Sequence, residues 1–132
     1  MKSSKQLGEP ISKPVTDITG VWTFLSSQPQ TGSEYLPITD TVIIKFFQQG
    51  KWIHTAYQTD NKKAVFIAGG SYSFDGKELI ETVEYHSKDF NAIGVITQYR
   101  VIFEGEKLQL SGTYQVAHSA PWKVEEYWQK QL

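Results

Sequence analysis

The alternation of short and long connectors between strand-like segments constrains this fold most. From Gly20 onward we find no convincing helix, and eight strand-like runs at residues 20–27, 41–48, 51–58, 64–74, 77–86, 93–104, 107–116 and 122–131. The connectors "QQGK", "FDGK" and "EGEK" are typical of tight hairpins, because Gly supplies the positive φ that such turns need. The remaining connectors are longer. In an up-and-down sheet this pattern places all tight turns at one end and all long loops at the other.

Eight sequential strands can close into a barrel, which removes the exposed edges of the sheet. A barrel of about eight strands can hold one small ligand. The alternative is an open sandwich of two four-stranded sheets. We favour the closed barrel because the strands are long and sequential, and residues 28–40 are long enough to act as a lid at its open end.

Length and composition indicate a single globular domain. The chain has 132 residues, which suits one core, and its polar start with Pro10 and Pro14 predicts a flexible segment at 1–17 before a barrel domain at 18–132. The formal net charge of -1, with no basic block, argues against nucleic acid or an anionic membrane as the main partner.

The sequence is compatible with more than one cellular compartment. The chain has no cysteine, which excludes disulfides and thiolate chemistry, and no apolar run long enough to span a membrane. We expect a cytoplasmic protein if the chain is complete, and a periplasmic or secreted one if a leader was removed.

Several short motifs resemble the bacterial lipocalin-like domains of the calycin group, a group that includes lipocalins and fatty-acid-binding barrels. They are "ITGVW" at 18–22, "AGGSYSFDGKELIETVEY" at 68–85, "EGEKLQLSGTY" at 104–114 and "VEEYWQK" at 124–130. The resemblance implies an eight-stranded antiparallel up-and-down β-barrel with one open end. It also implies that Trp22 packs at the closed end beneath a basic residue of the last strand, here Lys130 where lipocalins usually have Arg.

Alternation along the late strands predicts which side chains face inward. For residues 93–116 the inward set is Val95, Thr97, Tyr99, Val101, Phe103, Leu108, Leu110 and Tyr114. Arg100 is then outside. In the last strand the inward set is Trp122, Val124, Glu126, Trp128 and Lys130.

The 64–86 hairpin has one more polar face and one more apolar face. With a turn at Asp75-Gly76, Tyr72 lies opposite Leu79. The inward set is then Phe66, Ala68, Gly70, Tyr72, Leu79, Glu81, Val83 and Tyr85. Adjacent Gly69 and Gly70 are able to host a bulge that shifts the early part of the 64–74 strand.

The 41–58 hairpin is less clear. Its more uniformly apolar face, which we expect inside, is Val42, Ile44, Phe46, Ile53, Thr55 and Tyr57. The other face, which carries Lys45, Phe47, Trp52 and His54, is then outside, unless a bulge at "QQGK" inverts the assignment. Outward Phe47 and Trp52 suggest a homodimer contact, or two aromatics half covered by neighbouring side chains.

Glu81 and Glu126 come from non-adjacent strands, yet both are predicted to point inward at mid-height beside Tyr99. Because a dry core would not tolerate two carboxylates, we expect a hollow, polar-spotted lumen. The predicted ligand-binding residues are Tyr57, Tyr72, Glu81, Tyr85, Tyr99, Tyr114, Glu126 and Trp128. Alternatively, each Glu hydrogen-bonds a neighbour and only positions its strand.

The predicted ligand is a small, largely hydrophobic molecule, neutral or cationic. Fatty-acid binders of the wider group hold a carboxylate with an inward Arg-x-Tyr pair, whereas this chain has "EEYWQK" there and no Arg predicted inside. An alternative is an isomerase or cyclase that uses Glu81 or Glu126, with Tyr99, as general acid or base. A third is a surface-interaction protein that uses Phe47 and Trp52.

No metal or other cofactor is expected. The sequence lacks zinc-ligand spacing, a Gly-rich phosphate loop and a nucleophile elbow. His54, His86 and His118 fall on predicted outer faces or in a loop, where lone histidines are usually solvated.

Overall fold

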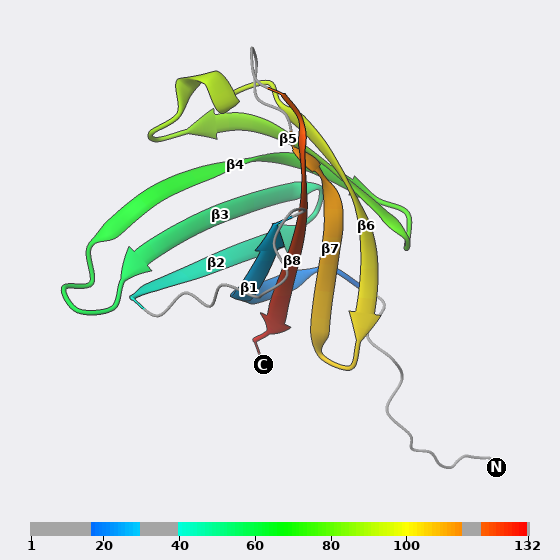
Figure 1. Ribbon diagram of the computed structural model, residues 1–132, viewed down its shortest axis with the longest axis horizontal. Helices are drawn as coiled ribbons and strands as arrows, with labels where there is room; N and C mark the ends of the chain where they lie inside the picture. Colours follow the sequence, from blue (N-terminus) through cyan, green and yellow to red (C-terminus); the bar gives the residue numbers. More distant parts are fainter. Residues whose placement is uncertain (1–16, 30–39, 115–119, 132) are drawn as a thin grey trace.

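Eight antiparallel strands close into one barrel, in which each strand pairs with its neighbours in the chain and the first pairs with the last (Figure 1). The computed structural model describes residues 17–29, 40–114 and 120–131. The strands are β1 (Gly20–Pro29), β2 (Thr41–Gln48), β3 (Lys51–Gln58), β4 (Ala64–Phe74), β5 (Glu78–His86), β6 (Ile96–Glu104), β7 (Lys107–Tyr114) and β8 (Trp122–Lys130). The predicted all-β, eight-stranded antiparallel up-and-down barrel is therefore confirmed.

The strand boundaries differ from the predicted ones by a few residues at most. A single helical turn, η1 (Phe90–Ala92), lies in the connector between β5 and β6, where the sequence predicted no helix. Most of the predicted N-terminal segment and lid, and His118, lie outside the described residues. Of the helices in the described part of the chain, none is both long and apolar enough to cross a membrane.

The tight turns set the register of the hairpins. Gln49 and Gly50 both have positive φ, 51° and 80°, as a two-residue turn of type I′ requires. The turn between β4 and β5 is longer than predicted, because the Asp75 carboxylate accepts hydrogen bonds from the backbone of Lys77 and Glu78. Tyr72 therefore lies opposite Glu81 rather than Leu79. Because the shift is even, the residues between this turn and Val83 keep their predicted faces.

The closed end of the barrel is filled by a hydrophobic core. Trp22 is fully buried, and its indole N–H donates to the carbonyl of Ile18 over 2.8 Å. The Lys130 ammonium lies 5.0 Å from the centre of a Trp22 ring and donates to the carbonyl of Thr19. The Trp22–Lys130 arrangement implied by the resemblance is thus present.

The inward face of the β2–β3 hairpin is the opposite of the predicted one. Lys45, Phe47 and Trp52 are 3%, 1% and 4% exposed, whereas Phe46 and Ile53 are 38% and 36% exposed. The predicted strand pairing was right, since Phe47 lies opposite Trp52 and no bulge intervenes. The choice of face was wrong because it relied on apolar uniformity, and this interior contains charges. Phe47 and Trp52 are core residues and offer no surface for a dimer or another partner.

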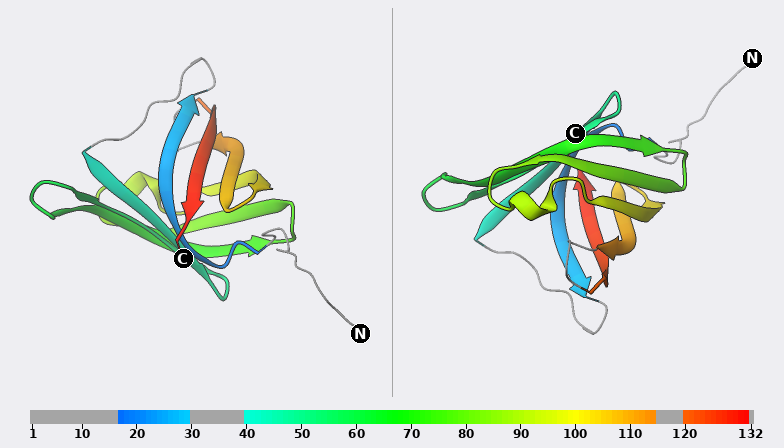
Figure 2. Two further views of the ribbon diagram at one scale, coloured as in Figure 1. Left: turned by 90° about the horizontal axis from the view of Figure 1, so that it is seen from below. Right: turned by 90° about the horizontal axis from the view of Figure 1, so that it is seen from above.

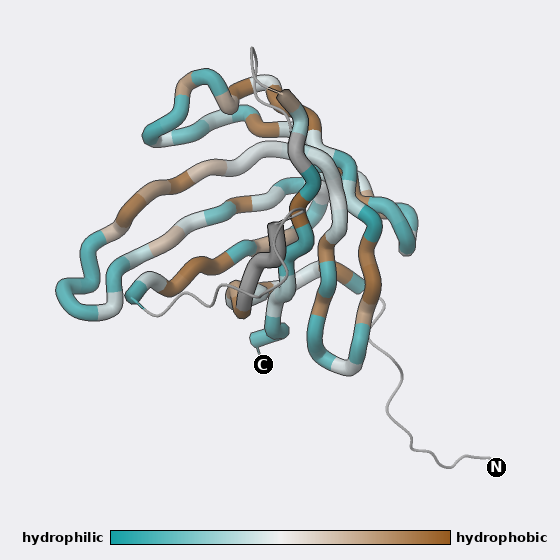
Figure 3. The backbone as a smooth tube through the Cα atoms, in the orientation of Figure 1, coloured by the Kyte–Doolittle hydropathy of each residue, from teal (hydrophilic) through white to brown (hydrophobic). Residues whose placement is uncertain are grey.

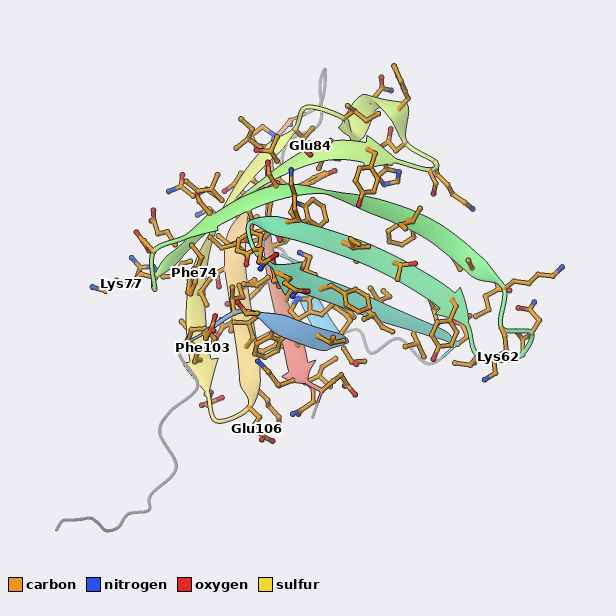
Figure 4. All side chains as sticks on the ribbon, turned by 180° about the vertical axis from the view of Figure 1, so that it is seen from behind. Lys62, Phe74, Lys77, Glu84, Phe103 and Glu106 are labelled. Carbon is orange, nitrogen blue, oxygen red and sulfur yellow. The ribbon has the colours of Figure 1, made fainter. Side chains whose placement is uncertain are left out.

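A β-bulge reverses the faces at the end of β5. Gly69 pairs with Tyr85 and Gly70 pairs with Val83, so Glu84 is an extra residue in β5, whereas the bulge was expected in the facing strand. Glu84 points away from the barrel (Figure 4). After the bulge His86 turns inward, and Tyr85, predicted inside, is 42% exposed.

The barrel wall is uneven in curvature. The strands β2 to β5 run side by side and form one wall of the barrel. The strands β6, β7, β8 and β1 form the opposite wall and run at a large angle to the first four (Figures 1 and 2). Hydrophilic residues gather in the turns between strands (Figure 3). Phe74 and Phe103, labelled in Figure 4, meet edge to face with ring centres 6.1 Å apart and join the two walls.

Candidate functional site: a cavity inside the barrel

Above the filled end, a cavity of about 280 Å³ lies between side chains of the strands β2 to β8. Its charged residues are Lys45, Glu81 and Glu126, and its rings are Trp52, His54, Phe66, His86, Tyr99 and Tyr114. A cavity of roughly 150 Å³ holds one benzene. This one is therefore large enough for a molecule of about two fused rings.

Glu81 forms a buried ion pair with Lys45. The ammonium Nζ of Lys45 lies 2.8 Å from Oε2 of Glu81, and the two side chains are 3% and 5% exposed. Burial raises the pKa of the Glu81 carboxyl, and the charge of Lys45 opposes that rise. A buried charge is tolerated when it is paired and hydrogen-bonded. The pair explains why a carboxylate lies in the middle of the inward face of β5.

Aromatic rings surround the Lys45 ammonium. Its Nζ lies 5.3 to 5.6 Å from ring centres of Phe47, Trp52, Tyr99 and Trp128. Such rings attract a cation through their negative faces. The protein therefore supplies its own cation to this aromatic cage, and Glu81 is its counter-ion.

Glu126 is the second inward carboxylate, and its hydrogen bond is weaker than the ion pair of Glu81. The indole N–H of Trp128 donates to Oε1 of Glu126 over 3.2 Å. A carboxylate can accept about four hydrogen bonds, so Glu126 retains accepting capacity on the cavity wall. Burial, with the charges of Glu126 and Glu81, raises the pKa of Tyr99 well above its usual value. The phenol of Tyr99 therefore keeps its proton.

His54, Phe66 and His86 form an aromatic wall of the cavity. The ring centres of His54 and Phe66 are 5.0 Å apart, and Phe66 stacks on His86 at 5.7 Å with an interplanar angle of 8°. The bulge at Glu84 is what brings His86 to this wall. The three rings offer a continuous surface against which a planar ligand can pack.

His54 is neutral near pH 7. Burial, together with the charge of Lys45, lowers the pKa of His54 from 6.5 to about 3. No hydrogen bond joins its ring to another of the described residues. A neutral imidazole carries one donor and one acceptor. His54 therefore presents unsatisfied polar atoms next to the cavity.

The ring of His86 is oriented by the backbone that follows it. Its Nδ1 accepts hydrogen bonds from the N–H groups of Lys88 and Asp89, over 3.1 and 2.8 Å. The hydrogen bonds assign the ring proton to Nε2. This local turn fixes the side chain as β5 leaves the barrel wall.

The structure brings together some of the predicted site residues and separates others. Glu81, Tyr99, Tyr114 and Glu126 line the cavity as predicted. Trp128 lies in the core, and Tyr72 packs against it, edge to face on Phe47 with ring centres 5.1 Å apart. Tyr57 and Tyr85, which were predicted to point inward, do not line the cavity.

Lys45, His54 and His86 line the cavity although sequence reasoning put them outside. For Lys45 and His54 a usable signal existed. Both residues share a face with the large apolar residues Phe47 and Trp52. In addition, an inward Lys45 would neutralise Glu81, which was already predicted to point inward. For His86 the adjacent Gly69 and Gly70 were the only signal, and it pointed to a bulge in the facing strand.

The cavity shows no preformed metal centre. Across residues 17–29, 40–114 and 120–131, no three or more His, Cys, Asp or Glu side chains converge in a group that could hold a metal ion. The chemistry of the wall is that of hydrogen bonding and aromatic packing.

Comparison with known proteins identifies the architecture. No protein-family model and no curated protein sequence matches the chain. Among solved structures it is similar to a lipocalin-like protein from Bacteroides uniformis, with a TM-score of 0.59 and 16% sequence identity over 86% of this chain and 98% of the other. At that identity the likeness shows the fold alone, a lipocalin-like barrel.

Proposed function

We propose that this lipocalin-like barrel binds one small, largely hydrophobic molecule, neutral or cationic, in the cavity between its walls. The observation that carries the proposal is the cavity of about 280 Å³, lined by aromatic rings and a few polar groups. Ligand sites usually combine an apolar lining with a few convergent polar groups. His54 is such a group, half-buried and without a hydrogen-bond partner among the described residues.

The charges of the cavity disfavour an anionic ligand. Lys45 is inside, but its charge is taken up by Glu81 at 2.8 Å. Glu126 then leaves an excess of one negative charge, since His54 stays neutral near pH 7. A carboxylate or phosphate headgroup would meet repulsion from Glu126 in surroundings where charges are poorly screened.

An NMR titration with indole, a neutral two-ring probe, tests the proposal. Ala68 is buried on the cavity wall, and its neighbour Ile67 is 45% exposed on the outside of the same strand. We expect saturable shifts in cavity residues and at least about tenfold weaker binding in Ala68→Phe, which fills the cavity. Ile67→Phe should bind as the wild type does. Indole binding that both variants leave unchanged would place the site elsewhere.

No specific observation favours the alternative of an isomerase or cyclase. The Glu81 carboxylate is already held by Lys45, and Tyr99 keeps its proton because its pKa is well above the usual value. The alternative of a surface-interaction protein relied on Phe47 and Trp52, and both are buried in the core. A homodimer stays a prediction for which these two residues provide no contact.

A further inference from the structure

Resting on the function proposed above, we infer that the cavity selects molecules in which one aromatic ring system carries a protonated amine, and that Glu126 rather than Glu81 binds the amine. The ligand class is an aryl-alkyl ammonium ion. The inference depends on which of the two inward carboxylates is free to accept a hydrogen bond.

Glu81 is already engaged. Its Oε2 accepts a hydrogen bond from Lys45 over 2.8 Å, and both side chains are almost fully buried. The cage around Lys45 is occupied as well, because its ammonium already lies 5.3 to 5.6 Å from the centres of four aromatic rings. A second cation in that cage would have to displace the first.

Glu126 has the opposite character. Its donor among the described residues is the Trp128 indole, at 3.2 Å, a long hydrogen bond from a neutral group. An ammonium group would add a charge-assisted bond, which is shorter and stronger. Glu126 is also half-buried on the cavity wall, so a ligand can reach it without displacing an internal partner.

The electrostatic surroundings of the cavity support a cation. Lys45 and Glu81 cancel, and His54 is neutral, which leaves Glu126 as the uncompensated charge. Burial raises the pKa of the Tyr114 phenol, and the negative charge of Asp89 adds to that rise. Asp89 is therefore a second negative charge that acts on a residue of the cavity wall.

The remaining wall suits the ring of such a ligand. Phe66, His54 and His86 present stacked and edge-on rings, and the volume fits about two fused rings. Packing of the ligand's ring against these side chains contributes affinity whether or not the ligand carries a charge. Ring and amine can thus be recognised by different residues of the same cavity.

Three indole compounds of similar shape separate these contributions. We expect tryptamine, which is protonated near pH 7, to bind at least about tenfold more tightly than indole, with indole-3-acetate weakest of the three. Isothermal titration of the wild-type protein measures the series. Equal affinities for tryptamine and indole would overturn the inference and leave the proposed function standing. Failure of all three to bind would overturn both.

Two neighbouring substitutions then locate the amine. Glu126→Gln keeps the size of the side chain and removes its charge, so tryptamine should lose its advantage while indole still binds. Glu125 accepts hydrogen bonds from Gln109 and Tyr127 and is not part of the cavity wall, which makes Glu125→Gln the matched control. A tryptamine preference that survives Glu126→Gln would contradict the assignment.

Discussion

Lys45 and Glu81 show how two residues from distant parts of the chain determine the character of the interior. Each would be costly to bury alone, and together they form a 2.8 Å ion pair in an aromatic cage. Because both are on the cavity wall, the pair also leaves Glu126 as the carboxylate open to a ligand.

Removing either partner of this pair should destabilise the protein strongly. We expect Lys45→Met and Glu81→Gln each to lower the free energy of unfolding by about 3–5 kcal/mol, because each leaves a buried group unpaired. The double variant should lose clearly less than the sum. Urea unfolding measures all three.

The exposed pair Lys51–Glu84 is a matched control, since its atoms are 3.6 Å apart and its side chains are 69% and 46% exposed. Lys51→Met should change stability by no more than about 1 kcal/mol. Strictly additive losses at Lys45 and Glu81 would show that the two do not interact in solution.

His54 makes stability depend on pH. Its pKa is about 3 in the folded protein and 6.5 ordinarily, so the unfolded chain binds the proton first as pH falls. The stabilisation is complete above pH 6.5 and is lost progressively down to about pH 3. Relative to His54→Phe, the wild type should lose about 2 kcal/mol between pH 7 and pH 5.

NMR titration of the His54 ring checks the same point without unfolding the protein. Its signals should stay those of a neutral imidazole down to pH 4. A midpoint near 6.5 would mean that the ring is solvated and that the cavity wall is more open than described.

At the scale of the elements, the bulge in β5 depends on glycine in β4. A Cβ at position 70 would lie 1.9 Å from the backbone oxygen of Thr82, an atom that cannot move away freely. We expect Gly70→Ala to cost about 3 kcal/mol or more. Ser73→Ala, on the outer face of the same strand, should change stability by less than about 0.5 kcal/mol. Similar unfolding midpoints for the two variants would contradict the described bulge.

The turn between β2 and β3 contains a residue in a strained backbone conformation, and a substitution there should increase stability. Gln49 has φ 51°, a conformation that Asn adopts more readily. Gln49→Asn should therefore stabilise the protein by about 0.5–1 kcal/mol, measured by thermal unfolding. Gln48→Asn, one residue earlier in the strand, should bring no gain. A loss at position 49 would indicate a different turn.

Sequence alternation predicted the faces of β6, β7 and β8 because one face of these strands carries most of the large apolar residues, although Ile96 and Ile102 are exposed and Glu126 points inward. It failed for β2 and β3, where one face offers Phe46 and Ile53 and the other Phe47 and Trp52 beside Lys45. Apolar character alone could not choose between them, since the deciding term is the contact of Lys45 with Glu81, 36 residues away. The bulge at Glu84 escaped prediction because a single extra residue leaves the local pattern nearly unchanged.

At the scale of the whole molecule, connector lengths were sufficient to predict topology. Tight turns gather at the filled end with Trp22 and Lys130, and the longer connectors that the structure describes, residues 59–63 and the η1-containing residues 87–95, lie at the other end. The cavity could be expected only in outline, from two inward carboxylates. The volume and the lining of the cavity depend on how side chains from seven strands pack together. The alternation of residues along single strands does not predict that packing.

A crystal structure of the protein grown with indole tests the central claim most directly. We predict density for one indole inside the barrel, in contact with Phe66 and His54, with the Lys45–Glu81 ion pair intact beneath it. An interior filled by the protein's own side chains, with indole absent or bound only to the outer surface, would contradict it.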